Sequence, residues 1–182
     1  MIDAAKFFKT VRGTLFKTLT QSQVDGCNAI LAVSDDLPVS YTAYMLATAY
    51  KETAFTMRPI AEYGRGKGRS YGTPRGPYKQ TYYGRGYVQL TWLENYQRAD
   101  KELHDAGILK STESLVRTPD LALRQDVAAY IMRYGMLEGW FTTKKLADYL
   151  PGNYVNARRI INGTDCAVEI AGYARIFEKA LT

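Results

Sequence analysis

The stretch from Arg58 to Gly86 constrains the fold of this chain more than any other feature of its sequence. It holds seven of the 15 glycines and three of the six prolines in the 182-residue chain. Glycine and proline at this density interrupt helices and favour turns. Loops of this length inside a compact domain are uncommon and usually serve a function. The sequence therefore predicts a long irregular loop or a small β-hairpin around residues 58–86.

The rest of the chain has helical patterns. Apolar residues recur at helical spacing from Ile2 to about Leu31, and Thr20 with Gln23 forms a capping box that starts a second helix within this segment. Ser40 is expected to cap the next helix, after a break at residues 35–38. Further helical segments are predicted near residues 93–109, 119–132, 153–161 and 168–181. We predict a mostly α single catalytic domain over residues 1–182, with N-terminal helices at 1–35 and a core at about 40–181.

Composition excludes several classes of protein. Apolar residues make up 46% and charged residues 23% of the chain, which is ordinary globular composition, and no apolar run approaches the roughly 18 residues of a membrane span. His104 is the only histidine, so zinc sites that need two or three histidines are excluded, and we expect it to be a solvated surface residue. Cys27 and Cys166 are expected to be small buried residues, and a disulfide between them is left open.

The net charge of the chain is concentrated in the loop. Residues 58–86 hold seven basic side chains and one acid, Glu62, so their net charge equals the +6 of the whole chain. Such a patch attracts polyanions. Charge alone leaves three interpretations open: a nucleic acid partner, an anionic bacterial cell wall, or a solvated basic loop.

Two glutamates separate these interpretations. Glu52 lies at the C-terminal end of an apolar helix, where the helix dipole disfavours an acid. Ala49, Phe55 and Met57 are expected to give it apolar surroundings that keep a proton on it, whereas arginines near Glu62 are expected to keep that residue ionised. One acid and one base suit the hydrolysis of glycosidic bonds. A surface ion pair for each glutamate is the alternative.

Three motifs carry a resemblance to a known family. The string YYGRGYVQLTWLENY at residues 82–96 resembles the YYGRGPIQL-S/T-W-x-x-NY signature of family 19 glycoside hydrolases, the chitinase-like branch of the lysozyme superfamily. Residues 47–55, ATAYKETAF, resemble the segment of that family that carries its catalytic acid, and residues 157–166, ARRIINGTDC, resemble its IING motif. The resemblance covers residues 40–181 and is similar in appearance to compact phage endolysins.

The resemblance implies roles for particular residues and a lysozyme-like, family 19 chitinase-like fold. Glu52 is the implied general acid, Glu62 the implied general base, and Thr91 a residue that holds the attacking water. The implied sugar-binding or cleft-wall residues are Tyr83, Arg85, Gln89, Asn95 and Asn162. Neither a metal nor another cofactor is implied.

The chain departs from the family pattern at several positions. Lys51 stands where a histidine is common, Tyr87 replaces a proline, and Ile170 occupies the place of an arginine near the closing helix. If Lys51 and Glu52 face apart on the helix, the ammonium does not disturb the acid.

The function expected from these observations is an endolysin that cleaves β-1,4 bonds of peptidoglycan glycan strands as a muramidase, with inversion at the reacting carbon. Chitin or chito-oligosaccharide is the alternative substrate, and a non-catalytic cell-wall or nucleic-acid binding module is the second alternative. We expect a monomer with no nucleic acid partner. The N-terminus has no signal peptide pattern, so synthesis in the host cytoplasm and access to the wall through a holin are expected. The C-terminal helix is expected either to touch the outer-membrane surface or to pack in the core.

Overall fold

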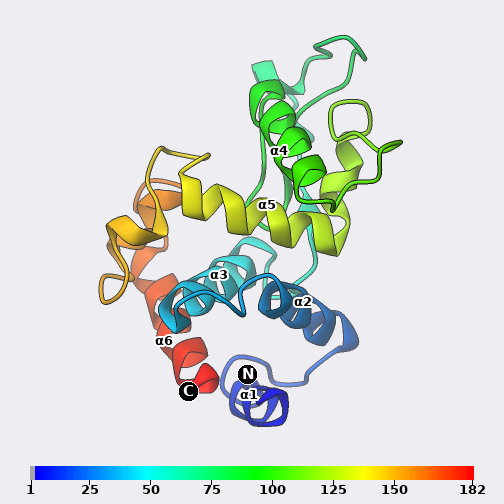
Figure 1. Ribbon diagram of the computed structural model, residues 1–182. Helices are drawn as coiled ribbons and strands as arrows, with labels where there is room; N and C mark the ends of the chain where they lie inside the picture. The colour runs from blue at the N-terminus through cyan, green and yellow to red at the C-terminus, as the bar shows by residue number, and fades with distance from the viewer. Residues whose placement is uncertain (1–2) are drawn as a thin grey trace. The chain divides into compact units, whose positions relative to one another are not determined.

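The computed structural model describes residues 3–182, and the part of the first predicted helix that falls on residues 1–2 lies outside them. The helical segments make up two compact units, the first from residues 1–57 and 133–182 and the second from residues 58–132. The prediction of a mostly α chain is confirmed (Figure 1).

The first unit is built around α3, Val39–Glu52. Ten of its 14 residues are buried, including an unbroken run from Thr42 to Tyr50, because neighbouring helices cover it on several sides. Its main partner is α6, Ala167–Leu181, and α2, Gln21–Ala32, packs against another part of it. Figure 1 shows α3 and α6 side by side, although more than a hundred residues separate them in the sequence.

The N-terminal segment contains a shorter first helix than predicted. The helix α1, Ala4–Val11, packs on α6, and Phe7 stacks on Phe177 with ring centroids 6.2 Å apart. The chain then turns, so the predicted helical continuation through residues 12–19 is wrong. The capping box at Thr20 and Gln23 is confirmed, with both of its hydrogen bonds present at the start of α2.

The start of α3 differs from the prediction. Ser40 does not cap it, because the helix already begins at Val39. Pro38 precedes the helix: it has no amide hydrogen, and its backbone conformation ends the preceding turn. Ser40 is instead a buried helical residue. The predicted break at residues 35–38 is confirmed by the turns that precede α3.

The closing helix α6 places an apolar face inside the first unit. Ile170, Ala174 and Phe177 are fully buried against its neighbours. This burial supports core packing as the role of that face. The segment before α6 contains two short 3-10 helices, η3 at Leu146–Asp148 and η4 at Asn156–Ile160, so the helix predicted over residues 153–161 is shorter and more tightly wound than expected.

The second unit contains the predicted hairpin. Strand β1, Ile60–Ala61, pairs antiparallel with β2, Arg85–Gly86, in a register that places Ile60 opposite Gly86. Between the strands the chain follows turns and the 3-10 helix η1, Ser70–Gly72. Gly66 and Gly72 touch through their backbones, and a Cβ on Gly72 would lie 2.0 Å from the Gly66 carbonyl oxygen. The dense glycines therefore allow the loop to fold tightly on itself.

Helices complete the second unit. The helix α4, Leu93–Asp105, ends four residues earlier than predicted, and the 3-10 helix η2, Pro119–Leu123, packs against β2. The helix α5, Gln125–Glu138, begins in the second unit and continues into the first.

Candidate active site

Glu52 is the last residue of α3 and is held by an arginine from a distant part of the first unit. Arg158 Nη1 donates to Glu52 Oε1 at 2.5 Å, across a sequence separation of 106 residues. The Arg158 side chain is only 5% exposed and that of Glu52 is 20% exposed. A charge-assisted hydrogen bond with this little solvent access fixes the carboxylate more firmly than a surface ion pair does.

The setting of Arg158 explains its orientation. It lies on η4, and its Nε donates to the carbonyl oxygen of Asp165 at 2.9 Å. The backbone therefore holds one edge of the guanidinium while the other edge meets Glu52. The prediction that Glu52 has apolar surroundings is only partly right. Ala49 and Met57 are buried as expected, but Phe55 is 41% exposed. The carboxylate also contacts a buried cation, which was not expected.

Lys51 faces away from this pair. Its Nζ lies 2.7 Å from Glu169 Oε2, and Tyr173 donates to the other oxygen of Glu169 at 2.6 Å. The hydrogen bonds from Lys51 and Tyr173 lower the pKa of Glu169, and the same ion pair raises the pKa of Lys51. Adjacent residues of α3 thus have separate partners, as the spacing of a helix predicts.

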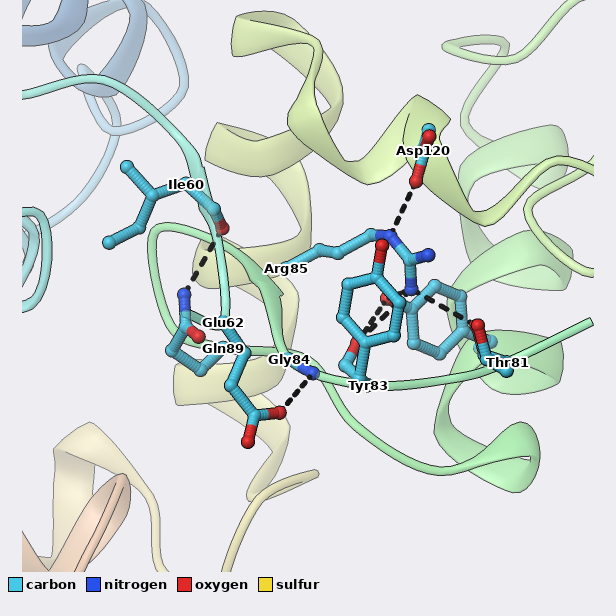
Figure 2. Close-up of polar contacts among 9 residues, drawn as sticks. Ile60, Glu62, Thr81, Tyr83, Gly84, Arg85, Gln89 and Asp120 are labelled. Carbon is cyan, nitrogen blue, oxygen red and sulfur yellow. Dashed lines mark hydrogen bonds and ion pairs between the residues drawn. The ribbon is translucent and has the colours of Figure 1, made fainter. Parts of the chain in front are cut away.

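Glu62 directly follows β1 in the second unit and is held by the neighbouring backbone. Its amide donates to the Gly84 carbonyl oxygen at 2.7 Å, and the Gly84 amide donates to Glu62 Oε2 at 3.2 Å. Tyr71 donates its hydroxyl proton to Glu62 Oε1 at 3.1 Å, and burial together with this hydrogen bond raises the pKa of Tyr71. Figure 2 shows the contact between Glu62 and Gly84. Both carboxylate oxygens of Glu62 therefore accept hydrogen bonds.

Gln89 supports the position of Gly84. Its amide nitrogen donates to the carbonyl oxygen of Ile60 at 3.2 Å (Figure 2). The same nitrogen lies 3.4 Å from the carbonyl oxygen of Gly86, so Gln89 ties together the two strands. A Cβ on Gly84 would lie 2.7 Å from Gln89 Oε1, so the Gln89 side chain would have to move to admit it. The amide of Gln89 thus holds the hairpin, and its predicted sugar contact stays a prediction.

Arg85 is buried beneath the hairpin, with 4% of its side chain exposed. Its Nε lies 2.7 Å from Asp120 Oδ1, and its Nη1 donates to the carbonyl oxygens of Thr81 and Tyr83 (Figure 2). Its guanidinium also lies 3.6 Å from the centre of the Tyr83 ring. Arg85 and Tyr83 therefore form a bracing cluster for β2, and their predicted role in the wall of a cleft stays a prediction.

The remaining predicted residues are more exposed. Thr91 is half-buried just before α4, and its carbonyl oxygen accepts from Asn95 Nδ2 at 2.9 Å. Asn162 is exposed in the first unit, and its side chain accepts from the amide of Gly163 at 2.9 Å. Glu62 and five other predicted site residues belong to the second unit; the five are Tyr83, Arg85, Gln89, Thr91 and Asn95. Glu52 and Asn162 belong to the first unit.

Two partners of the glutamates were not singled out by the sequence. Arg158 precedes the IING motif within the string ARRIING, and a basic residue beside a matched motif is a weak signal that could have marked it. Tyr71 is one of five tyrosines in the 58–86 loop, and nothing in its local sequence separates it from the others. Both residues became identifiable only through their contacts.

Other reactive groups have structural surroundings. His104 Nε2 lies 3.0 Å from the carbonyl oxygen of Glu113 and 3.9 Å from Asp100, so it is partly buried rather than fully solvated. Cys27 is buried, which raises its pKa to about 12, while Cys166 is only half-buried, contrary to expectation. Both thiols are free.

Within residues 3–182, no group of three or more His, Cys, Asp or Glu side chains is arranged to hold a metal ion. None of the helices described over the same residues combines the length and the apolar character that crossing a bilayer requires.

Comparison with solved structures identifies the fold. Chitinase C from Streptomyces griseus superposes with a TM-score of 0.64 at 22% identity, over 99% of this chain and 76% of that one. A bacterial family 19 chitinase, reported for its differences from plant enzymes, gives a TM-score of 0.55 at 22% identity, over 99% of this chain and 94% of its own. The chain therefore has the fold of the family 19 chitinases, as predicted.

Comparison with curated sequences is more limited. An endochitinase of Arabidopsis thaliana is 31% identical over 87 residues, which is 48% of this chain and 26% of that protein. The match thus spans about a quarter of the relative's length. No protein-family profile matches the chain.

Proposed function

We propose that this chain is a glycoside hydrolase that cleaves β-1,4 bonds of bacterial peptidoglycan as a muramidase-type endolysin. The observation that carries the proposal is a pair of glutamates with different hydrogen-bonding partners on the fold of family 19 chitinases. One carboxylate oxygen of Glu52 accepts a hydrogen bond from a guanidinium, whereas both carboxylate oxygens of Glu62 accept hydrogen bonds. Glycoside hydrolysis needs two carboxyl groups in separate roles, one as acid and one as base, and this chain supplies two that are held by different partners.

In the proposed reaction Glu52 is the general acid. Arg158 binds Oε1, which fixes the side-chain rotamer and leaves Oε2 to carry the proton that passes to the leaving glycosidic oxygen. Glu62 is the general base: it takes a proton from a water molecule that Thr91 helps to hold. The water attacks the anomeric carbon from the face opposite the leaving group, so the configuration inverts. This scheme needs carboxyl groups about 6.5–9.5 Å apart in the substrate complex and no metal ion.

The donors on Glu62 give its proposed role a physical basis. Gly84 and Tyr71 hold the carboxylate in one orientation before substrate arrives, so a positioned base costs little reorganisation during the reaction. Tyr83, Arg85 and Gln89 act in this scheme through the hairpin that carries Gly84. Asn95 and Asn162 remain proposed sugar contacts.

The charge distribution favours peptidoglycan as the substrate. Residues 58–86 carry the equivalent of the whole net charge of +6, and an anionic polymer is attracted to such a surface whereas neutral chitin is not. Chitin or chito-oligosaccharide is the alternative substrate. It is favoured by the relatives named above, which are described as chitinases and an endochitinase.

The proposed biological role is lysis of a bacterial host by a phage. In that role the protein is a monomer, is made in the host cytoplasm, reaches the wall through a holin pore and has no nucleic acid partner. A non-catalytic wall-binding or nucleic-acid-binding module is the alternative, and it predicts salt-dependent binding without hydrolysis.

Glu52→Gln tests the proposal. The amide keeps the shape of the side chain and can accept from Arg158 but cannot donate an acidic proton, so hydrolysis of purified peptidoglycan should fall at least about 100-fold with folding intact. Turbidity loss of sacculi, release of new reducing N-acetylmuramic acid ends and circular dichroism are the measurements. Glu102→Gln on α4 is the matched control and should retain activity. A fully active Glu52→Gln variant, or a wild type that binds sacculi without cleaving them, contradicts the proposal.

A further inference from the structure

An aromatic and basic surface continues outward from Glu62 in the second unit. The Tyr71 hydroxyl contacts Glu62, and the Tyr71 ring meets Trp92 edge-on with ring centroids 5.3 Å apart. The guanidinium carbon of Arg75 lies 5.7 Å from the centre of the Trp92 ring. Glu62, Tyr71, Trp92 and Arg75 thus form a continuous row of contacts, which we call the Glu62 row.

Trp92 has the properties of a sugar-binding plane. It is 38% exposed, so a large part of its ring reaches solvent although an arginine lies over it. Its amide donates to the Tyr82 carbonyl oxygen at 2.9 Å, and its backbone has a φ of 74°, a conformation that β-carbon-bearing residues seldom adopt. From this backbone position the indole contacts both Tyr71 and Arg75. The apolar faces of sugar rings pack well on exposed aromatic planes of this kind.

Arg75 differs from the other stacked arginine of the same unit. Arg85 is 4% exposed and its charge is neutralised by Asp120 at 2.7 Å. Arg75 is half-buried, and within residues 3–182 no carboxylate lies within 4.0 Å of its guanidinium. Its backbone is fixed by reciprocal hydrogen bonds with Gln80 at 2.8 and 3.2 Å. Arg75 therefore presents planar donors from a rigid turn, with their charge available to an external anion.

We propose that Arg75 recognises the acidic substituent that distinguishes peptidoglycan from chitin. In this arrangement, which rests on the proposed function, a sugar packs on Trp92 and its neighbour reaches Glu62. Chitin carries a free hydroxyl at O3 of every sugar. In peptidoglycan every second sugar carries a lactyl group at O3 that continues into a peptide with carbonyl and carboxylate oxygens. A guanidinium is suited to both kinds of acceptor and binds carboxylates with two parallel hydrogen bonds.

Recognition by Arg75 differs from the general attraction exerted by the basic loop. The other cations of the loop raise the local concentration of any polyanion, and their effect declines as salt screens it. A contact between Arg75 and the O3 substituent instead discriminates between two glycans that share the same backbone. Its signature is a change in the ratio of two activities, measured at one salt concentration.

The experiment compares Arg75→Gln with Lys67→Gln. Both remove one positive charge from the same loop, but Lys67 is exposed, whereas Arg75 is half-buried and lies over the Trp92 ring. Initial rates are measured on purified sacculi and on the hexasaccharide of N-acetylglucosamine at 0.15 M salt. We expect Arg75→Gln to lower the ratio of the sacculus rate to the hexasaccharide rate about tenfold, the loss typical of a hydrogen bond to a charged group. Lys67→Gln should leave that ratio within about twofold.

The outcomes distinguish this inference from the proposed function. If Arg75→Gln lowers both rates equally, or if both variants change the ratio alike, peptide recognition by Arg75 is overturned while glycosidase activity stands. A wild type that cleaves the hexasaccharide but not sacculi overturns both the proposed peptidoglycan substrate and this inference, while glycosidase activity stands. A wild type that cleaves neither substrate overturns the proposed function and with it this inference. Arg75→Lys, which retains a cation beside Trp92 but loses the planar donors, should recover part of the ratio.

Discussion

The surroundings of Glu52 and Glu62 differ in the range of the contacts that hold them. Glu52 depends on a side chain 106 residues away, whose own position comes from the packing of η4 in the first unit. Glu62 depends on Gly84 and Tyr71, both within the second unit and within 22 residues of it. One glutamate is therefore fixed by tertiary packing and the other by the geometry of a hairpin and its loop. Substitutions should affect the two settings differently.

The largest effect of a substitution on the free energy of unfolding is expected at Arg158. Arg158→Met leaves a poorly solvated carboxylate without its cation, so the free energy of unfolding should fall by about 2 kcal/mol, somewhat less than for a fully buried pair. Arg159→Met, on the exposed neighbour in the same 3-10 helix, is the control and should change it little. Urea denaturation measures both. The loss should shrink in a Glu52→Gln background, and an equal loss there would contradict the ion-pair explanation.

Gly84→Ala tests whether the hairpin holds Glu62. The new methyl group would meet Gln89 Oε1 at 2.7 Å and displace the side chain that ties the strands, at a cost of about 1–2 kcal/mol. Activity should fall as well, because the Gly84 amide would no longer meet the carboxylate. Gly64→Ala, where nothing lies within 4 Å, is the control. Thermal unfolding and peptidoglycan hydrolysis are the measurements, and matching results for the two variants would reject this role of Gly84.

Tyr71→Phe removes one donor from Glu62 and keeps the ring against Trp92. The loss of one hydrogen bond of about 1 kcal/mol should lower the free energy of unfolding by no more than that amount, and the looser carboxylate predicts a roughly fivefold lower kcat. Tyr63→Phe is the matched control, because Tyr63 is adjacent to Glu62 in sequence but fully exposed. A steady-state comparison that finds both variants alike would mean that the Tyr71 hydroxyl does not position Glu62.

The smallest effect on stability is expected at the ion pair between Lys51 and Glu169. Because the pKa of Glu169 is lowered in the folded chain, its contribution to stability is present above the unfolded value of about 4.3 and is lost as pH falls through the folded value. Glu169 is 41% exposed, so this contribution should stay below about 1 kcal/mol. Melting temperatures of wild type and Glu169→Gln should differ slightly at pH 7 and converge below pH 4. A difference that grows in acid would contradict this assignment.

The elements near the two glutamates were predictable because their signals are local. The capping box at Thr20 follows from side chains three residues apart, and the hairpin around residues 58–86 follows from glycines and prolines that prevent a helix. The position of Glu52 near the C-terminal end of α3 was also expected, although the helix ends three residues before Phe55, where the pattern placed its end. The start of α3 was predicted two residues too late, because Ser40 is a good cap in isolation whereas Pro38 ends the preceding turn and is the actual N-cap.

The sequence by itself determined the helical fold, the irregular loop with its concentration of charge and Glu62, and the motif that contains Glu52. Short-range backbone preferences and spacing fix these features. Only the tertiary structure decided that Arg158 contacts Glu52, that Arg85 is neutralised by Asp120, and that Arg75 lies over Trp92 with its charge available. Each of these depends on which side chains meet after packing, and identical arginines acquire different roles because burial and nearby carboxylates differ from one position to the next.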